Sequence, residues 1–148
     1  MLNNYFTPPP QGQTILTALL TQAKTSVRAW IYSINLQSLA EALITLHTHG
    51  IDVQCVCDPE TEVAANQPIK SMCQAGIACW TDHTVQLMHT KACLIDATTL
   101  VTGSWNWTTQ ADNEQDNALL ITDDPTTCAA YAANWQQIQE RSEPWRIP

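Results

Sequence analysis

The spacing of apolar positions changes from segment to segment along the chain and predicts an alternation of strands and helices. Residues 27–32 alternate their side chains and are rich in β-branched and aromatic types, which is typical of a strand. Residues 14–24 and 36–49 repeat apolar positions every three or four residues, which predicts two amphipathic helices. Further strands are expected at 5–6, 52–58, 77–80, 90–96, 100–103 and 118–122, and further helices at 68–75 and 125–140.

This order of elements predicts an α/β fold with a mixed, mostly parallel β-sheet, flanked by helices on both faces and joined by right-handed crossovers. With 148 residues and 45% hydrophobic content, the chain is expected to form one globular domain, 1–148. No apolar run reaches transmembrane length and the first residues lack a signal-peptide pattern, so a cytoplasmic location is the default and the compartment is otherwise unknown.

Six cysteines could form disulfides in an oxidising compartment. Cys55, Cys57 and Cys93, however, lie on predicted buried strands, where cysteine usually serves as a small core residue. No Cys-x-x-Cys pair indicates a zinc site. We therefore expect free, buried thiols.

The residues with the clearest chemistry lie in the segment 89–96 and in the Gly-Ser run that follows it. His89 and Lys91 are two apart on a predicted extended segment, so their side chains share a face. A histidine can attack phosphorus or donate a proton, and a lysine can hold an anion beside it. Ser104 and Asn106 add donors for phosphate oxygens if they share a face. These residues predict a phosphate-ester site that contains no metal-ligand set.

The full spacing resembles a known motif. His89-x-Lys91, four residues, Asp96, six residues and then Gly103-Ser104-x-Asn106 is similar to the HKD motif of the phospholipase D superfamily. The run from 103 to 111, closing on Asp116-Asn117, resembles the small single-motif endonucleases of that superfamily. The resemblance covers nearly the whole chain and implies a phospholipase D-like α-β-α sandwich that needs no cofactor.

The resemblance also implies roles for single residues. His89 would be the nucleophile, and Lys91, Ser104 and Asn106 would bind the phosphate. Family members usually end the motif region with Glu-Asn, whereas this chain has Asp116-Asn117 in a loop one residue shorter. The acid that supports the histidine is therefore either Asp116 or Glu114.

Two motif residues are expected to have structural roles. Asp96 begins the turn before Leu100 and should hold that turn through bonds from its side chain to the backbone. Gly103 should supply a conformation or a close approach that a Cβ would block. Trp105 and Trp107 could stack a base, but packing in the core or at a dimer interface is the better interpretation.

One His-x-Lys per chain leaves the mechanism incomplete, because a group must also protonate the leaving alcohol. A two-fold homodimer that brings two copies of His89 into one site would supply that group. The resemblance implies the same arrangement.

The net charge of −8, from 14 acids and six bases, argues against tight binding to long duplex DNA and favours a short or single-stranded substrate. The leading interpretation is a metal-independent phosphodiesterase that acts on nucleic acid. One alternative keeps the chemistry but cleaves a membrane phospholipid, although no basic amphipathic helix indicates docking to a bilayer. A second is a catalytically inactive binding or effector module.

Overall fold

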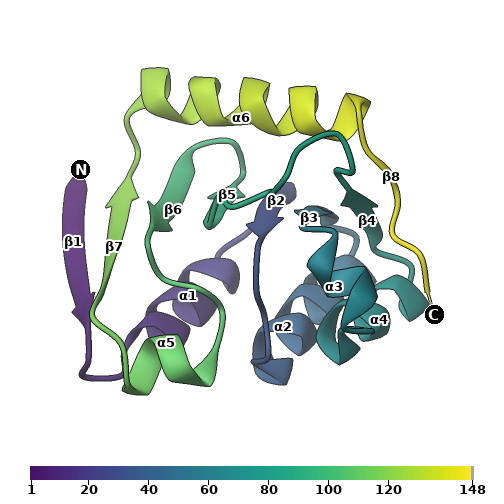
Figure 1. Ribbon diagram of the computed structural model, residues 1–148. Coiled ribbons are helices and arrows are strands. Elements are labelled where there is room, and N and C mark those ends of the chain that lie inside the picture. The colour runs from purple at the N-terminus through teal and green to yellow at the C-terminus, as the bar shows by residue number, and fades with distance from the viewer. Residues whose placement is uncertain (148) are drawn as a thin grey trace.

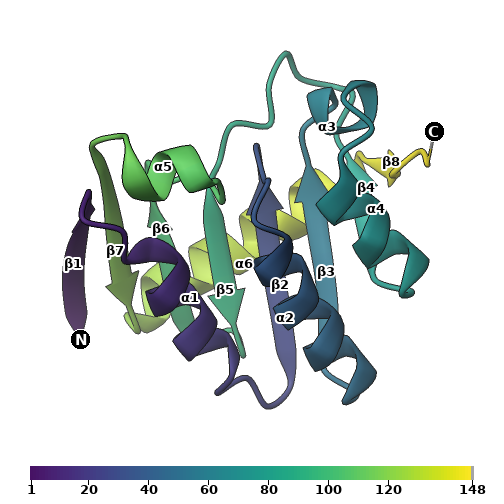
Figure 2. The same cartoon turned by 90° about the horizontal axis from the view of Figure 1, so that it is seen from below.

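The computed structural model describes residues 1–147 and shows an eight-stranded sheet with helices on both faces (Figures 1 and 2). The strands are β1 (Leu2–Thr7), β2 (Ser26–Ile31), β3 (Asp52–Cys57), β4 (Ala78–Thr81), β5 (Ala92–Ile95), β6 (Thr99–Gly103), β7 (Asn117–Thr122) and β8 (Glu143–Pro144). The helices are α1 (Gly12–Leu20), α2 (Gln37–Thr48), α3 (Glu60–Val63), α4 (Gln67–Gln74), α5 (Thr109–Asn113) and α6 (Pro125–Glu140).

The strand order across the sheet is β1-β7-β6-β5-β2-β3-β4-β8. The predicted mixed sheet between two helical layers is confirmed, but it is not mostly parallel, because only the β2–β3 and β3–β4 pairs run parallel. The other five neighbouring pairs are antiparallel. Parallel neighbours need a long crossover, which α2 provides after β2 and which α3 and α4 provide after β3. The three residues between β5 and β6 are too few for a crossover, so these strands pair antiparallel.

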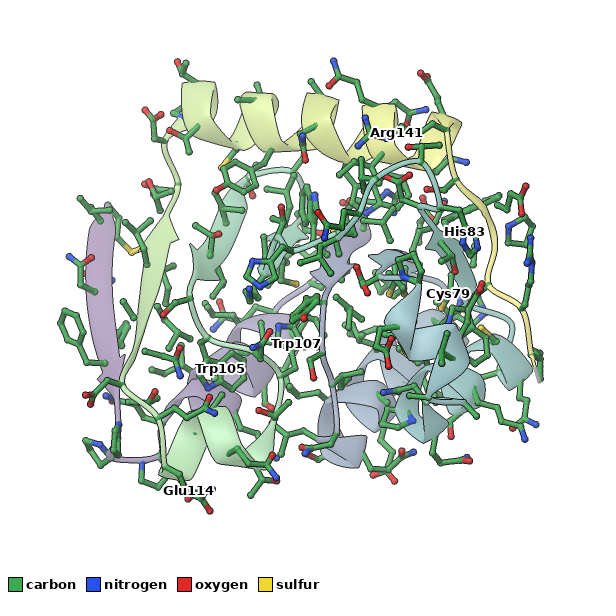
Figure 3. The ribbon with its side chains drawn as sticks, in the orientation of Figure 1. Cys79, His83, Trp105, Trp107, Glu114 and Arg141 are labelled. Atoms are coloured by element: carbon green, nitrogen blue, oxygen red, sulfur yellow. The ribbon has the colours of Figure 1, made fainter. Side chains whose placement is uncertain are left out.

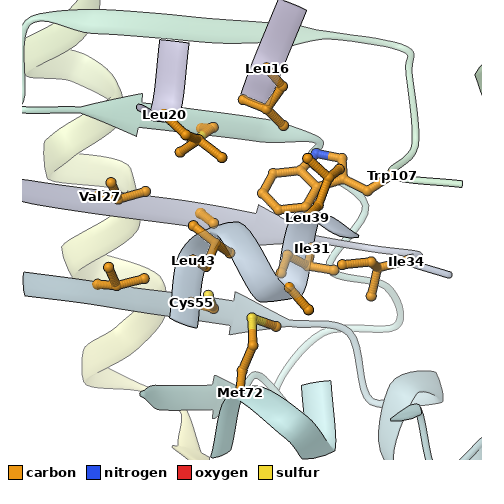
Figure 4. Packing of buried hydrophobic residues seen from close by; sticks show 14 of the residues in the cluster. Leu16, Leu20, Val27, Ile31, Ile34, Leu39, Leu43, Cys55, Met72 and Trp107 are labelled. Atoms are coloured by element: carbon orange, nitrogen blue, oxygen red, sulfur yellow. The ribbon is translucent and has the colours of Figure 1, made fainter. Parts of the chain in front are cut away.

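The central strands alternate their side chains between two separate cores. On β2, Val27, Ala29 and Ile31 pack with α1, α2 and α4, whereas Trp30 packs on the opposite face with α6. Figure 4 shows the first of these cores, with Leu16 of α1 and Leu39 of α2 on the face of the sheet opposite α6. Because successive side chains of a strand point to opposite faces, both faces of the central strands are buried, each in its own core.

The long helix α6 covers the second face alone, as Figure 2 shows with α6 behind the sheet and α1 and α2 in front of it. The expected apolar stripe of α6 is confirmed, since Cys128, Trp135 and Ile138 are buried. The indole Nε1 of Trp135 donates a 3.1 Å hydrogen bond to the Ala29 carbonyl oxygen of β2. This bond and the apolar stripe fix α6 across the centre of the sheet.

Several element boundaries differ from the predicted ones because distant side chains set them. The first helix begins at Gly12 rather than Thr14, since the buried Asp112 carboxylate accepts the Gly12 N–H at 2.7 Å. It ends at Leu20 rather than at Lys24, whose backbone N–H is held by Asp96. The sequence did not predict α3, α5 or β8.

All six cysteines are free thiols, as expected, and five of them are buried while Cys73 is half-buried. A hydrogen bond to Cys79, together with burial, raises the pKa of Cys57 and Cys73. Burial raises the pKa of Cys93 to about 12. Cys57, Cys73 and Cys93 therefore remain protonated at neutral pH and act as small core residues.

Candidate active site

The predicted site residues other than Asp96 lie at the edge of the sheet where β2, β3, β4 and β6 end and where β5 and β7 begin. Asp96 follows the end of β5 and lies at the opposite edge, beside the start of β2. In Figure 2 the connection from β4 to β5, residues 82–91, crosses the upper edge of the sheet, where α3 and α5 also lie. Loops at the carboxyl ends of parallel strands commonly form binding crevices. The fold thus gathers the motif segments on one side of the molecule.

His89 and Lys91 are in contact just before β5. Lys91 Nζ lies 3.1 Å from both ring nitrogens of His89 and donates a 2.8 Å hydrogen bond to the His89 carbonyl oxygen. His89 is exposed, so its ring is accessible from outside the chain. The two side chains lie together as the spacing predicted, although the strand begins at Ala92 rather than at Thr90.

Tyr32, which the sequence analysis did not single out, touches both of these residues. Its ring meets the His89 ring edge-on, with centroids 4.4 Å apart, and Lys91 Nζ lies 4.9 Å from the centroid of the tyrosine ring. Tyr32 directly follows β2, whose Trp30 pairs with Ala92 at the start of β5. Only this antiparallel register places Tyr32 beside the motif, and the sequence does not give the register.

The electrostatic environment of the site depends on Lys91. Burial lowers its pKa from the ordinary value, because the charged ammonium loses hydration. Arg28, Arg141 and Arg146 are each paired with an acid, namely Asp52, Asp82 and Glu143. These arginines are neutralised by their acids, whereas Lys91 contacts His89 and brings a positive charge to it, in a chain of net charge −8.

Ser104 and Asn106 follow the end of β6. Ser104 Oγ donates to Asn117 Oδ1 at 3.0 Å and accepts the Ala118 N–H at 3.0 Å, which fixes it against the start of β7. Asn106 Oδ1 is buried and has no hydrogen-bond partner among residues 1–147. Asn117, to which the sequence analysis gave no role, therefore orients the serine.

The two motif residues expected to be structural hold neighbouring segments together. Asp96 accepts hydrogen bonds from the backbone N–H groups of residues 24, 25 and 26, so it fixes the loop before β2 rather than its own turn. Burial alone would raise the pKa of Asp96, but these N–H donors hold it below its usual value. Gly103 has φ +142°, and a Cβ there would lie 2.0 Å from the Ala118 carbonyl oxygen, so both its conformation and its surroundings require glycine.

The candidate supporting acids do not reach His89 within one chain. Asp116 and Glu114 are both exposed, and neither forms a hydrogen bond to His89 within residues 1–147. Figure 3 shows Glu114 at the outer end of α5, directed away from the sheet.

The tryptophans of the Gly-Ser run face inwards (Figures 3 and 4). Trp105 is 4% exposed and Trp107 is 3% exposed, which leaves neither ring free to stack on a base. Trp105 Nε1 donates to the buried Asp112 Oδ1 at 3.1 Å, the same carboxylate that begins α1. The two tryptophans therefore pack in the core, as preferred from the sequence, and they anchor the loop that carries Ser104 and Asn106.

Residues 1–147 contain neither a cluster of metal-binding side chains nor a helix that could span a membrane. No group of three or more histidine, cysteine, aspartate or glutamate side chains there is arranged to hold a metal ion. None of the helices in that range is long and apolar enough to cross a bilayer.

Known proteins resemble this chain over almost its full length. The family described as "Cardiolipin synthase, PLD-like domain" matches residues 16–139. A mitochondrial cardiolipin hydrolase from Xenopus tropicalis is 32% identical over 129 residues, which are 87% of this chain and 61% of that protein. The Homo sapiens protein of the same name is 30% identical over 138 residues, which are 91% of this chain and 55% of that protein. The chain thus spans between about half and two thirds of the length of these curated relatives.

A solved structure agrees with these matches. The phospholipase D family member Nuc from Salmonella typhimurium superimposes with a TM-score of 0.89 at 25% identity, covering 99% of this chain and 98% of that one. The names of these relatives, cardiolipin hydrolases and a phospholipase D family member, support the phosphodiester hydrolase class that the motif indicated. The chain belongs to the phospholipase D superfamily.

Proposed function

We propose that this protein is a metal-independent phosphodiester hydrolase that forms a covalent phosphohistidine at His89. The observation that carries the proposal is the cluster at the sheet edge, where an exposed imidazole lies 3.1 Å from the Lys91 ammonium and against the Tyr32 ring. An imidazole nitrogen of His89 attacks phosphorus while the bond to the leaving oxygen breaks. Lys91 and Asn106 would stabilise the charge that develops on the phosphate oxygens, and Ser104 would join them once its hydroxyl turns away from Asn117.

A homodimer would supply the missing general acid. The leaving oxygen takes a proton from His89 of a second chain, and that same ring then accepts a proton from the water that breaks the phosphorus–nitrogen bond. Two adjacent rings favour one neutral and one charged form, as the two roles require. Asp116 or Glu114, exposed in one chain, would accept a hydrogen bond from the other nitrogen of an imidazole and fix its tautomer.

We propose nucleic acid as the substrate, because the motif resembles single-motif endonucleases and Nuc is matched over 98% of its chain. The net charge and the ion-paired arginines favour a short or single-stranded substrate over long duplex. A phospholipid diester is the second candidate, and the specific observation in its favour is that the curated relatives carry the name cardiolipin hydrolase.

The test uses the wild-type chain, His89→Asn and the control His49→Asn, which alters an exposed histidine at the far end of α2. Each is incubated in EDTA with single-stranded DNA, duplex DNA, RNA, cardiolipin vesicles and a chromogenic bis-aryl phosphodiester. Cleavage by wild type and His49→Asn but not by His89→Asn is expected. After acid-free quenching, wild type should carry on His89 a covalent adduct of the phosphoryl group with its remaining ester group.

Each other outcome has a definite meaning. Loss of activity in EDTA would contradict the proposed metal independence. Residual turnover in His89→Asn would contradict the assignment of His89 as the nucleophile. Cleavage of cardiolipin without any nucleic acid would move the proposal to the lipid. No cleavage of any substrate would favour an inactive binding or effector module.

A further inference from the structure

The loop that carries His89, residues 82–91, has neither helix nor strand and is held instead by two buried carboxylates. At its start, Asp82 is fully buried, and its Oδ1 accepts the Thr84 N–H at 2.9 Å while its Oδ2 accepts from Arg141 Nε at 2.9 Å. Figure 3 shows Arg141 at the C-terminal end of α6. At the other end of the loop, Asp58 holds the residue immediately before His89.

Asp58 directly follows β3 and is 1% exposed. Its Oδ2 accepts the Met88 N–H at 2.7 Å, and its Oδ1 accepts the Glu60 N–H at 2.9 Å where α3 begins. One carboxylate therefore joins the end of a central strand, the start of a helix and the backbone next to His89. A charged acceptor forms stronger hydrogen bonds than a neutral one, and burial strengthens them further.

Met88 is fixed a second time by its own side chain. It is 3% exposed and packs in the core beneath α6, with Trp30 and Leu94. With its N–H bound to Asp58 and its side chain buried, Met88 leaves little freedom to the Cα of His89. The Tyr32 ring and the Lys91 ammonium then limit the rotation of the imidazole.

We propose that Asp58 is a positioning residue, whose buried carboxylate sets the height of His89 above the sheet edge through the backbone of Met88. The inference rests on the proposed role of His89 as nucleophile. Asp58 touches no reacting atom; it acts by holding the imidazole where its nitrogen meets phosphorus in line. A displacement of about 1 Å at such a position can cost 100-fold in rate.

Asp58→Asn tests this directly, because the amide is isosteric but has only one oxygen. It can accept from Glu60 or from Met88, and its NH2 group then faces the other N–H, donor against donor. Asp58→Glu keeps the charge and moves the carboxylate outwards by one methylene, which serves if the asparagine variant does not fold. The matched control is Asp52→Asn, at the opposite end of β3, where the carboxylate is exposed and pairs with Arg28.

The first readout needs no activity and therefore separates this proposal from the proposed function. Amide hydrogen exchange by NMR should show a protected Met88 N–H in wild type and Asp52→Asn, and exchange at least about tenfold faster in Asp58→Asn. An unchanged Met88 exchange rate in the variant would show that Asp58 does not hold the loop, whether or not the protein is an enzyme.

The second readout is steady-state kinetics on the bis-aryl diester. In Asp58→Asn we expect kcat to fall about 10- to 100-fold with KM within about threefold, since ground-state binding is retained while alignment is lost. Faster Met88 exchange with an unchanged kcat would reduce Asp58 to a purely structural residue. A rise in KM at constant kcat would make it a substrate-binding determinant, and either result overturns the positioning role.

Discussion

At the residue scale, the site depends on contacts between residues that are close in space but far apart in the sequence. Lys91 is placed by three neighbours: the His89 ring, the His89 carbonyl oxygen and the Tyr32 ring. The motif spacing predicted the first contact, whereas Tyr32 lies about sixty positions earlier in the chain. The aromatic ring provides a face for the ammonium and a wall for the imidazole, so it orients both groups at once.

Replacement of Tyr32 should separate these two effects. Tyr32→Phe keeps the ring and should leave kcat within about threefold of wild type, because the contacts are made by the ring and not by the hydroxyl. Tyr32→Ala removes the wall and should lower kcat about tenfold or more. Steady-state kinetics on the bis-aryl diester measures both, and equal losses in the two variants would assign the role to the hydroxyl instead.

Lys91 should give phosphate binding a pH dependence of definite sign. Because burial lowers its pKa below the ordinary 10.5, the ammonium is lost at a lower pH than for a free lysine. Competitive inhibition by inorganic phosphate should weaken as the pH rises from 8 towards that lowered pKa. In Lys91→Arg the guanidinium stays charged, so the alkaline loss should disappear. The same loss in the arginine variant would assign the titration to another group.

At the scale of elements, the long periodic segments were predictable and the short ones were not. The β2, β3, α2 and α6 patterns gave the correct type because each buries a full face. The short α5 reads as a polar loop, since its start is set by the Thr108 side chain accepting the Ala111 N–H and its packing by the buried Asp112. The pairing of the strands was the least predictable feature of the fold. Whether two neighbouring strands run parallel or antiparallel depends on loop lengths and register rather than on the spacing of apolar residues.

For the candidate site, the spacing predicted the contact between His89 and Lys91 but not the residues that hold these two in place. His89 and Lys91 were identified from two positions in one segment. Asp58 follows β3, Tyr32 follows β2 and Asn117 begins β7, so they reach the site only through the order of strands in the sheet. No local pattern distinguishes them from ordinary strand-end residues.

The turn into Ser104 gives a prediction about glycine. Gly103→Ala should destabilise the chain by about 3 kcal/mol or more, because a Cβ would clash with the Ala118 carbonyl oxygen in a backbone conformation that already disfavours it. Gly50→Ala is the matched control: φ is +87°, but a Cβ there meets nothing within 4 Å, so only about 1 kcal/mol is expected. Urea unfolding measures both, and equal costs would contradict the steric argument.

The Asp96 clamp predicts how stability depends on pH. Its pKa is lower in the folded chain than in the unfolded chain, so its contribution is complete above the unfolded value of about 3.9 and is lost as the pH falls through the folded value. Asp96→Asn should therefore be less stable than wild type at pH 7, and the difference should shrink towards pH 2. Asp116→Asn, at an exposed acid, is the control, and parallel curves for wild type and Asp96→Asn would refute the prediction.

At the scale of the whole molecule, the proposed shared site makes activity a property of pairs. When wild type and His89→Asn chains are unfolded together and refolded in equal amounts, random pairing leaves about a quarter of the dimers with two intact histidines. Activity per total protein should then be about one quarter of that of wild type, and it should follow the square of the wild-type fraction at other ratios. A linear dependence would show that each chain works alone.

The mass of the particle provides an independent check. Native mass spectrometry should find a species of twice the 16.4 kDa chain. A monomer with full activity would contradict the shared site directly.

The cysteines described with the fold have a practical consequence. Cys73 is half-buried and the other five thiols are buried. A fluorescent maleimide should therefore attach slowly to α4 alone in the native protein, while denaturant releases six reactive groups. The number of labels per chain thus measures the fraction of unfolded molecules. A single dye on α4 of each chain would also report the pairing of two chains through energy transfer between the dyes.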